Sequence, residues 1–306
     1  MAATPAKKDY RRGIDLLRFV AALGIVADHA MGWWVVGYPA LGVFLILTSY
    51  FSVGSYLRGA GQGFWSSRAM RLLKPWLFWC LFYRAVYEVV SDEPFALLRE
   101  PFSLLVGPSV HLWFLPFAAL ALAAVPLIAR HVTTRARLTA AAAGVAVLWV
   151  LLGLVHANEG IAGWLVPEGD GLPQPFPQWA FSLPIYLWGA LAAVAHRMEA
   201  TRTVLLWAAA GSAVMTALHF DQASWQLLLS AAIFEAVWRL RGGGAWMTAA
   251  AGYAFGLYLM HPFFELVGYK LVGSDMAPHT GFLFGVIGSV AGTWVLRRIP
   301  GLRGMA

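Results

Sequence analysis

Long apolar stretches separated by short polar ones dominate the chain. A helix needs roughly 20 mostly apolar residues to cross the ~30 Å hydrocarbon core of a bilayer, and ten runs bounded by charge, Pro or Gly approach this length. They cover residues 14–36, 39–57, 72–90, 111–129, 138–155, 179–195, 204–218, 225–240, 247–266 and 281–296. The pattern predicts an all-α, polytopic membrane bundle of about ten transmembrane helices. The seventh and eighth runs are short for a full crossing, so a tilt, a distortion or a different division of these two stays open.

Composition excludes the common alternatives to a membrane protein. Hydrophobic residues make up 60% of the 306 positions and charged residues 12%. This leaves too little polar surface for a soluble enzyme and too few charges for a disordered chain. Cys80 is the single cysteine, so an intramolecular disulfide is impossible.

Basic residues fall in alternate polar segments between the apolar runs. Cytoplasmic loops of membrane proteins carry an excess of Lys and Arg, so these segments are expected to face the cytoplasm, as both termini are. The 22 basic residues outnumber the 15 acidic ones, but their place in short loops argues against a nucleic-acid partner. Only Arg99 and Lys270 are expected on the outer side. The residues expected inside are Lys7, Lys8, Arg11, Arg12, Arg58, Arg68, Arg71, Lys74, Arg130, Arg135, Arg137, Arg197, Arg202, Arg239, Arg241, Arg297, Arg298 and Arg303.

The first apolar run carries ionisable residues that are costly to place in lipid and therefore indicate a functional site. Arg18 and His29 are eleven residues apart, which puts them within about 20° of one helix face and roughly 16 Å apart along the axis. An anionic ligand entering from the cytoplasm would meet Arg18 first and react near His29, whose imidazole can take and return a proton. Snorkelling of Arg18 to the interface and a helix-bridging role for His29 are the structural alternatives. Asp28 points about 100° away from His29, and its role stays open.

Three further polar sets lie within predicted spans. Arg84 and Glu88 are spaced i,i+4, which fits either an ion pair on one helix face or a functional role. His261 and Glu265 are one turn apart in the ninth run, and Glu235 lies in the inner half of the eighth.

The segment before the third run offers a site for phosphate. Arg68 and Arg71 are spaced i,i+3 on an expected short cytoplasmic helix, and two guanidinium forks on one face suit phosphate oxygens. Ordinary enrichment of basic residues on the cytoplasmic side is the alternative. The glycines at 59, 61 and 63 do not form a phosphate-binding fingerprint between a strand and a helix. The histidines are scattered without ligand spacing, so no metal is expected.

Five short motifs follow one another along the chain. They are Arg18 followed by His29, residues 42–51, Arg68-x-x-Arg71, residues 111–116 including Trp113, and residues 258–262. In this order, within a chain predicted to have about ten transmembrane helices, they resemble the acyltransferase 3 family, integral membrane O-acyltransferases of bacteria and some eukaryotes. Tyr50 departs from the family pattern, which usually has Gly at that place, while Ser49 and Phe51 are retained.

The resemblance implies transfer of an acyl group from a cytoplasmic acyl-CoA, most often acetyl-CoA, to a hydroxyl of a cell-envelope saccharide or similar acceptor. Arg68 and Arg71, with Lys74, Arg12 and the Ser49 motif, would hold the donor, and Arg18 would orient it. His29 would deprotonate the acceptor hydroxyl or carry the acyl group itself, with Asp28 in second place. Trp113, Glu88 and His261 are further candidates.

The implied setting is a multi-pass protein of a bacterial-type cytoplasmic membrane, in contact with membrane lipid. The cytoplasmic N-terminal segment covers residues 1–13, the acyltransferase transmembrane domain 14–297 and the cytoplasmic tail 298–306. The acceptor, the acyl chain and the oligomeric state stay open. A transporter or flippase of a lipid-linked sugar is the competing class, since charges also lie inside such bundles. A non-catalytic subunit of a polysaccharide-export complex is the third.

Overall fold

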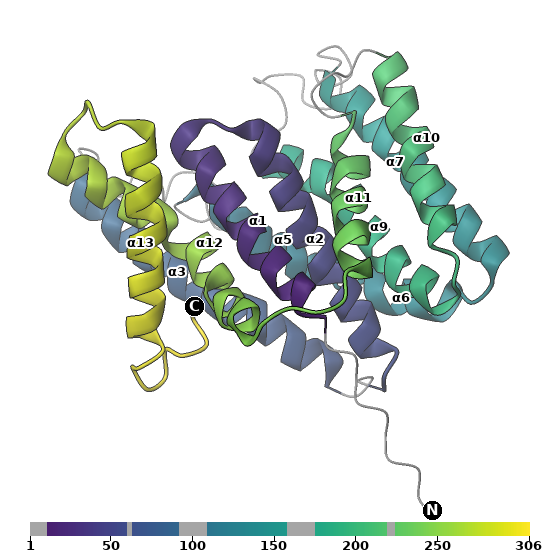
Figure 1. Ribbon diagram of the computed structural model, residues 1–306, viewed down its shortest axis with the longest axis horizontal. Helices are drawn as coiled ribbons and strands as arrows, with labels where there is room; N and C mark the ends of the chain where they lie inside the picture. Colours follow the sequence, from purple (N-terminus) through teal and green to yellow (C-terminus); the bar gives the residue numbers. More distant parts are fainter. Residues whose placement is uncertain (1–10, 60–62, 92–108, 158–174, 219–223) are drawn as a thin grey trace, which may run out of the picture.

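The structure is a computed structural model that describes residues 11–59, 63–91, 109–157, 175–218 and 224–306 (Figure 1). Lys7, Lys8 and Arg99, whose sides of the membrane were predicted, lie outside these residues. Within the described ranges the fold is all-helical. The helices are α1 (Arg12–Met31), α2 (Trp34–Tyr56), α3 (Phe64–Val90), the short 3-10 helix η2 (Val110–Trp113), α5 (Phe114–Ala121), α6 (Ala124–His131), α7 (Arg135–Ala157), α9 (Phe176–Arg197), α10 (Thr201–Ala217), α11 (Gln226–Arg239), α12 (Ala245–Val272) and α13 (Pro278–Leu296).

Each predicted apolar run overlaps one helix or, for the fourth run, the series η2, α5 and α6. The first run was predicted to extend to residue 36, but α1 ends at Met31, where Gly32 adopts a left-handed conformation, and residues 34–36 belong to α2. The third run begins earlier than predicted, at Phe64, so Arg68 and Arg71 belong to the first turns of α3 rather than to a separate short helix. The fourth run bends by 41° between α5 and α6. Pro126 lies in the first turn of α6. In a continuous regular helix its ring would clash with the carbonyl of Leu122, four residues earlier, so the helix bends there.

Within the part of the chain that the structure describes, four helices are long and apolar enough to cross a membrane. They are Trp34–Tyr56, Arg135–Leu154, Phe176–Arg197 and Pro278–Leu296, and the bent pair His111–Ala121 and Ala124–His131 adds a fifth if it is one span. The helices α10 and α11 have only 17 and 14 residues, which is short for a crossing. Membrane-spanning helices are therefore present by length and composition, while the count of ten spans stays a prediction.

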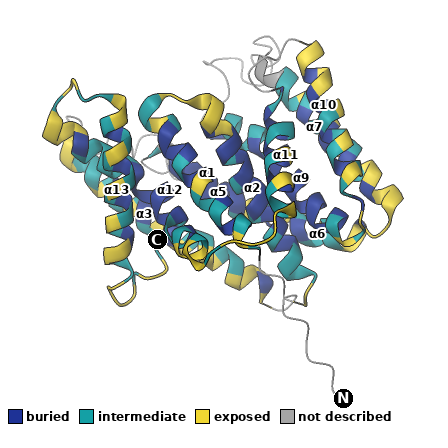
Figure 2. Cartoon of the chain, viewed as in Figure 1, coloured by how far each residue is buried: buried dark blue, intermediate teal, exposed yellow. Residues whose placement is uncertain are grey.

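The helices α1 and α2 form the centre of the molecule (Figure 1). α1 packs against α2, α12 and α13, and α2 packs against α9 and α11 on its other side. Buried residues concentrate along these contacts (Figure 2). Gly189 allows α9 to approach α2 closely, since a Cβ there would lie 2.6 Å from the Cα of Ile46. Small residues at such contacts are typical of helices that pack within a membrane.

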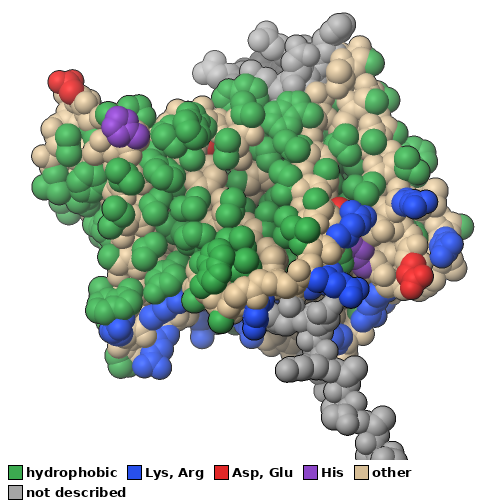
Figure 3. All heavy atoms as spheres, in the orientation of Figure 1, with side chains coloured by type: hydrophobic (Ala, Val, Ile, Leu, Met, Phe, Trp, Pro, Cys, Tyr) green, Lys and Arg blue, Asp and Glu red, His purple; other side chains and the backbone are tan. Residues whose placement is uncertain are grey.

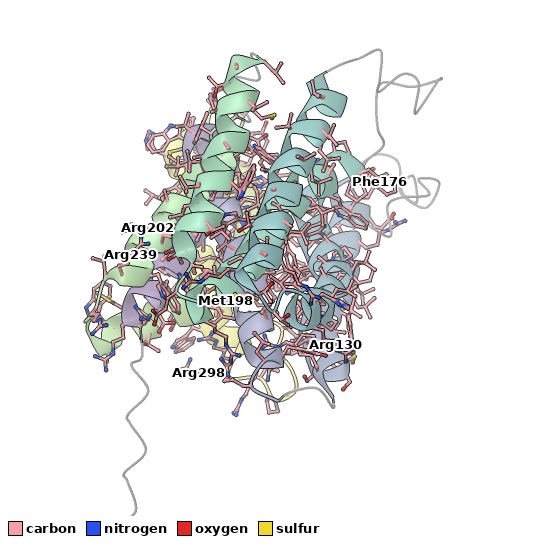
Figure 4. The ribbon with its side chains drawn as sticks, turned by 90° about the vertical axis from the view of Figure 1, so that its right-hand side faces the viewer. Arg130, Phe176, Met198, Arg202, Arg239 and Arg298 are labelled. Carbon is pink, nitrogen blue, oxygen red and sulfur yellow. The ribbon has the colours of Figure 1, made fainter. Side chains whose placement is uncertain are left out.

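Basic side chains gather along one edge of the molecule. In Figure 3 Lys and Arg lie along the lower edge and on the right-hand side, around a broad hydrophobic surface. Figure 4 shows Arg130, Arg239 and Arg298 lower than Phe176, which begins α9. We call this side the basic edge. Arg130, Arg239 and Arg298, which were predicted to share one side of the membrane, thus lie on one side of the fold.

Candidate active site

A cavity of about 440 Å³ opens among α1, α2, α3, α5 and α12. Its volume falls in the range typical of small-molecule sites, and its walls combine apolar side chains with a few polar ones. The lining residues are Arg18, Phe44, Leu47, Thr48, Phe51, Ser52, Arg68, Arg71, Leu72, Phe114, Leu122, Ala251, Gly252, Phe255 and Tyr258.

Three arginines from two helices line this cavity. Arg18 comes from the second turn of α1, and Arg68 and Arg71 come from the first turns of α3. Among the described residues, none of the three forms a salt bridge with a carboxylate. Burial, and then the positive charges of Arg71 and Arg58, lower the pKa of Arg68, which precedes the predicted third span. The cavity therefore holds positive charge that an anionic ligand can neutralise.

The α2 wall of the cavity presents hydroxyl oxygens and an aromatic ring. Thr48 donates its hydroxyl hydrogen to the Phe44 carbonyl at 2.7 Å, and Ser52 donates to the Thr48 carbonyl at 2.6 Å. Because these hydrogens are used, both oxygens are left as acceptors for groups in the cavity. The guanidinium of Arg18 lies 5.8 Å from the centre of the Phe51 ring, within cation–π range.

An aromatic wall of Phe44, Phe114 and Tyr258 forms another part of the lining. The centre of the Tyr258 ring lies 6.4 Å from that of Phe44 and 5.6 Å from that of Phe114. Tyr258 is buried, and its hydroxyl donates to the backbone carbonyl of His111. One residue therefore touches both the cavity and the histidines described next.

Three histidines from separate segments meet beside the aromatic wall. The ring centres of His29 and His261 are 4.9 Å apart, and those of His111 and His261 are 5.4 Å apart. The His111 ring also lies 5.6 Å from the ring of Tyr258. His261 is fully buried and His111 is 4% exposed, whereas His29 is exposed. The cluster thus presents one imidazole to a ligand and keeps two behind it.

The structure separates the other predicted donor-site residues from the cavity. Ser49 faces α9 instead, where its hydroxyl donates to the Ile46 carbonyl at 3.1 Å and Gly189 packs against it. The neighbouring Thr48 and Ser52 line the cavity instead. Lys74 is exposed and is not part of the lining. Arg12 is likewise outside the lining and donates to the Gly243 carbonyl at 2.6 Å.

The remaining candidates have packing or pairing partners. Asp28 packs against Gly37 where α1 meets α2. Glu88 accepts a hydrogen bond from Arg84 at 2.8 Å, so the i,i+4 ion pair considered from the sequence is formed. Trp113 is buried, and its carbonyl accepts a hydrogen bond from the Trp179 indole at 3.3 Å.

Tyr50 belongs to a second polar group, away from the histidine cluster. Its hydroxyl lies 2.8 Å from Nδ1 of His196, and Nε2 of His196 donates to Glu235 at 2.8 Å. Arg239 pairs with the other carboxylate oxygen of Glu235 at 3.1 Å. The tyrosine that departs from the family pattern thus links α2 to α9 and α11 through hydrogen bonds.

His111 and the aromatic wall are parts of the site that the sequence does not predict. In the sequence His111 stands out only as part of a motif, and Phe44 and Phe114 are indistinguishable from ordinary apolar residues of a span. Their shared feature is contact with Tyr258, which is distant in the chain. The only signal was that all of them lie in or beside the quoted motifs.

Comparisons with known proteins agree with the motifs. A family model described as an acyltransferase domain, Acyl_transf_3, matches residues 11–298, nearly the whole chain. No curated protein and no solved structure was found to match the chain. Within the described residues, no group of three or more His, Cys, Asp or Glu side chains is placed to hold a metal ion.

Proposed function

The chain belongs to the acyltransferase 3 family. We propose that it transfers an acyl group, with acetyl as the first candidate, from acyl-CoA to a hydroxyl of a cell-envelope saccharide or similar acceptor. The basic edge faces the cytoplasm in this proposal, as the distribution of Lys and Arg predicts. The membrane is a bacterial-type cytoplasmic membrane.

One observation carries the proposal more than any other. The arginines 18, 68 and 71 line a single cavity, and Tyr258 of the same cavity contacts the histidine cluster. An acyl-CoA has phosphates at one end and a reactive thioester at the other, joined by a long neutral arm. The arginines of the cavity suit the phosphates, and the histidine cluster next to Tyr258 supplies a proton acceptor for the reaction at the thioester.

In this proposal the cavity walls offer groups for the phosphates and for the neutral arm of the donor. Arg68 and Arg71 form charge-assisted hydrogen bonds with phosphate oxygens, and Arg18 orients the adjoining polar groups. The acceptor oxygens of Thr48 and Ser52 suit the amide N–H groups of the neutral arm. Phe51 and Phe255 cover the arm's apolar carbons.

His29 carries out the proton transfer. It takes the proton of the acceptor hydroxyl while that oxygen bonds to the thioester carbonyl carbon, and the C–S bond breaks. The proton then passes to the thiolate, so that free CoA leaves. The exposure of His29 supports approach of the acceptor from the side opposite His261. In the relay variant, the ring nitrogen of His29 holds the acyl group between two such transfers.

The aromatic wall lies between the donor cavity and His29. Tyr258 and Phe114 contact each other across the lining, and Tyr258 also contacts His111. The thioester therefore reaches His29 by passing these rings, which requires their side chains to rotate.

The proposal is tested with purified protein in lipid nanodiscs and isolated envelope glycans. We expect acetyl-CoA to be consumed with release of free thiol, and mass spectrometry to show acetyl esters on the glycans. Cells that lack the protein should lack the same esters. An absence of both thiol release and acetyl-CoA binding would contradict the proposal and favour a transporter or a non-catalytic subunit.

A further inference from the structure

His261 is the buried neighbour of the exposed His29, and the hydrogen bond of one ring nitrogen determines the state of the other. Nδ1 of His261 lies 3.0 Å from the Leu257 carbonyl. A carbonyl oxygen only accepts hydrogen bonds, so Nδ1 carries the hydrogen. In the neutral imidazole Nε2 is then a bare acceptor.

This Nε2 atom is buried and makes no hydrogen bond with any described residue. The side chain as a whole has 0% exposure. Buried polar atoms are almost always hydrogen-bonded, because leaving one unpaired is costly. An unpaired acceptor beside a reactive group therefore needs an explanation.

His111 cannot satisfy this acceptor, although its ring also touches His261. Nε2 of His111 lies 3.3 Å from the Leu259 carbonyl and so donates to it. Nδ1 of His111 is then an acceptor, and the Ser109 hydroxyl lies 2.8 Å from it. Both nitrogens of His111 are in use, which leaves His29 as the neighbouring imidazole able to donate.

Neither ring nitrogen of His29 has a hydrogen-bond partner among the described residues, and its ring is tilted by 57° to that of His261. The ring nitrogens lie away from the ring centres, so two nitrogens that face each other are closer than the 4.9 Å that separates the centres. Rotation of His29 about χ2 can therefore bring facing nitrogens within hydrogen-bond distance.

We propose that His261 is a positioning residue for His29, an inference that rests on the proposed function. When His29 takes the acceptor's proton, both of its nitrogens carry hydrogen, and one of them donates to Nε2 of His261. This hydrogen bond fixes the His29 ring and stabilises its positive charge until the proton passes to the thiolate. His261 keeps its own hydrogen on Nδ1 throughout and does not touch the substrate.

Two substitutions separate this role from a packing role. His261→Leu fills similar space without an acceptor, whereas His261→Gln supplies an amide oxygen. We expect the leucine variant to lower kcat about 10- to 100-fold, the usual effect of losing a hydrogen bond to a charged group. KM for acetyl-CoA should be unchanged, because His261 does not line the donor cavity. The glutamine variant should recover most of the lost kcat.

The experiment uses the full chain in nanodiscs, with His279→Gln as the control for loss of an imidazole, since His279 is exposed at the start of α13. If the leucine variant does not fold, His261→Phe replaces it. Full kcat in the apolar variant, or an equal loss in the apolar and glutamine variants, would overturn the positioning role. A wild-type protein without transferase activity would instead refute the proposed function and this inference with it.

Discussion

The arginines that line the cavity have no carboxylate partner among the described residues, unlike two other arginines of the chain. Arg18, Arg68 and Arg71 share one cavity, whereas Arg84 pairs with Glu88 and Arg239 pairs with Glu235. Arg18 is predictable from the sequence because a charge inside a predicted span is costly, and Arg68 and Arg71 because their i,i+3 spacing puts two guanidinium groups on one helix face. The acceptors Thr48 and Ser52 are not predictable in this way, since hydroxyl residues are common in membrane helices.

Arg68→Lys should weaken acetyl-CoA binding, because an ammonium group cannot reproduce the paired hydrogen bonds of a guanidinium to phosphate. A loss of about tenfold in affinity is expected, corresponding to one charge-assisted hydrogen bond. Binding to nanodisc-embedded protein is measured by isothermal titration calorimetry over a range of salt concentrations. The matched control is Arg135→Lys, an exposed arginine at the start of α7. Equal acetyl-CoA affinities for the wild type, Arg68→Lys and Arg135→Lys would show that Arg68 does not bind the donor and reflects only the usual excess of basic residues on the cytoplasmic side.

Tyr50→Phe should destabilise the protein without affecting donor binding. The substitution removes the hydroxyl beside His196 Nδ1 and leaves that partly buried group with one partner fewer. A loss of about 1 to 3 kcal/mol in the free energy of unfolding is expected. Denaturant titration in detergent micelles measures it, with Tyr269→Phe as the control because Tyr269 is 46% exposed. Unchanged stability, or loss of acetyl-CoA binding, would show that the tyrosine has a different role.

At the scale of helices, hydrophobic patterning locates the elements but does not resolve how they break or continue. The runs predict where helices lie because a span needs a long apolar stretch. The pattern misses the bend at Leu122, which depends on Pro126. It also misses the extension of α3 to Phe64, a buried residue whose ring packs against Tyr56. The cavity forms where α1, α2, α3, α5 and α12 pack together, and the apolar pattern of each run taken singly does not predict which helices pack against one another.

The aromatic wall between α2, α5 and α12 should limit the length of the acyl group. Phe114→Ala removes a buried ring from the lining and opens space beside Tyr258. The ratio of kcat/KM for butanoyl-CoA to that for acetyl-CoA should rise about 10-fold or more, since one or two methylenes change discrimination by this order. Phe117→Ala, a buried ring outside the lining, is the control. An unchanged ratio would place the acyl group elsewhere.

At the scale of the whole molecule, the distribution of charge is the clearest link between sequence and fold. Residues assigned to one side of the membrane from the sequence lie along the basic edge (Figures 3 and 4). This agreement follows from alternation, because successive helices return the chain to the same side after two crossings. The sequence could not predict that three distant histidines meet, since that depends on how α1 and α12 pack.

Topology follows from this arrangement and can be tested directly. Reporter fusions placed after Arg137 and after Arg303 should both report the cytoplasm, because basic loops are retained there. A fusion after Asp275, in the turn between α12 and α13, should report the opposite side. A fusion after Arg303 that reports the outer side would contradict an even number of crossings.

The central claim is that His29 is the proton acceptor of the transfer reaction, and His29→Ala tests it most directly. Acetyl transfer and acetyl-CoA binding are measured on the same nanodisc preparation, with Asp28→Asn as a neighbouring variant expected to be milder. A positioned base contributes about 10²- to 10⁴-fold in rate. The account predicts a loss of transfer of at least this size with donor binding retained, because His29 does not line the donor cavity. Near-normal transfer by His29→Ala would contradict both the base role and the acyl-relay role.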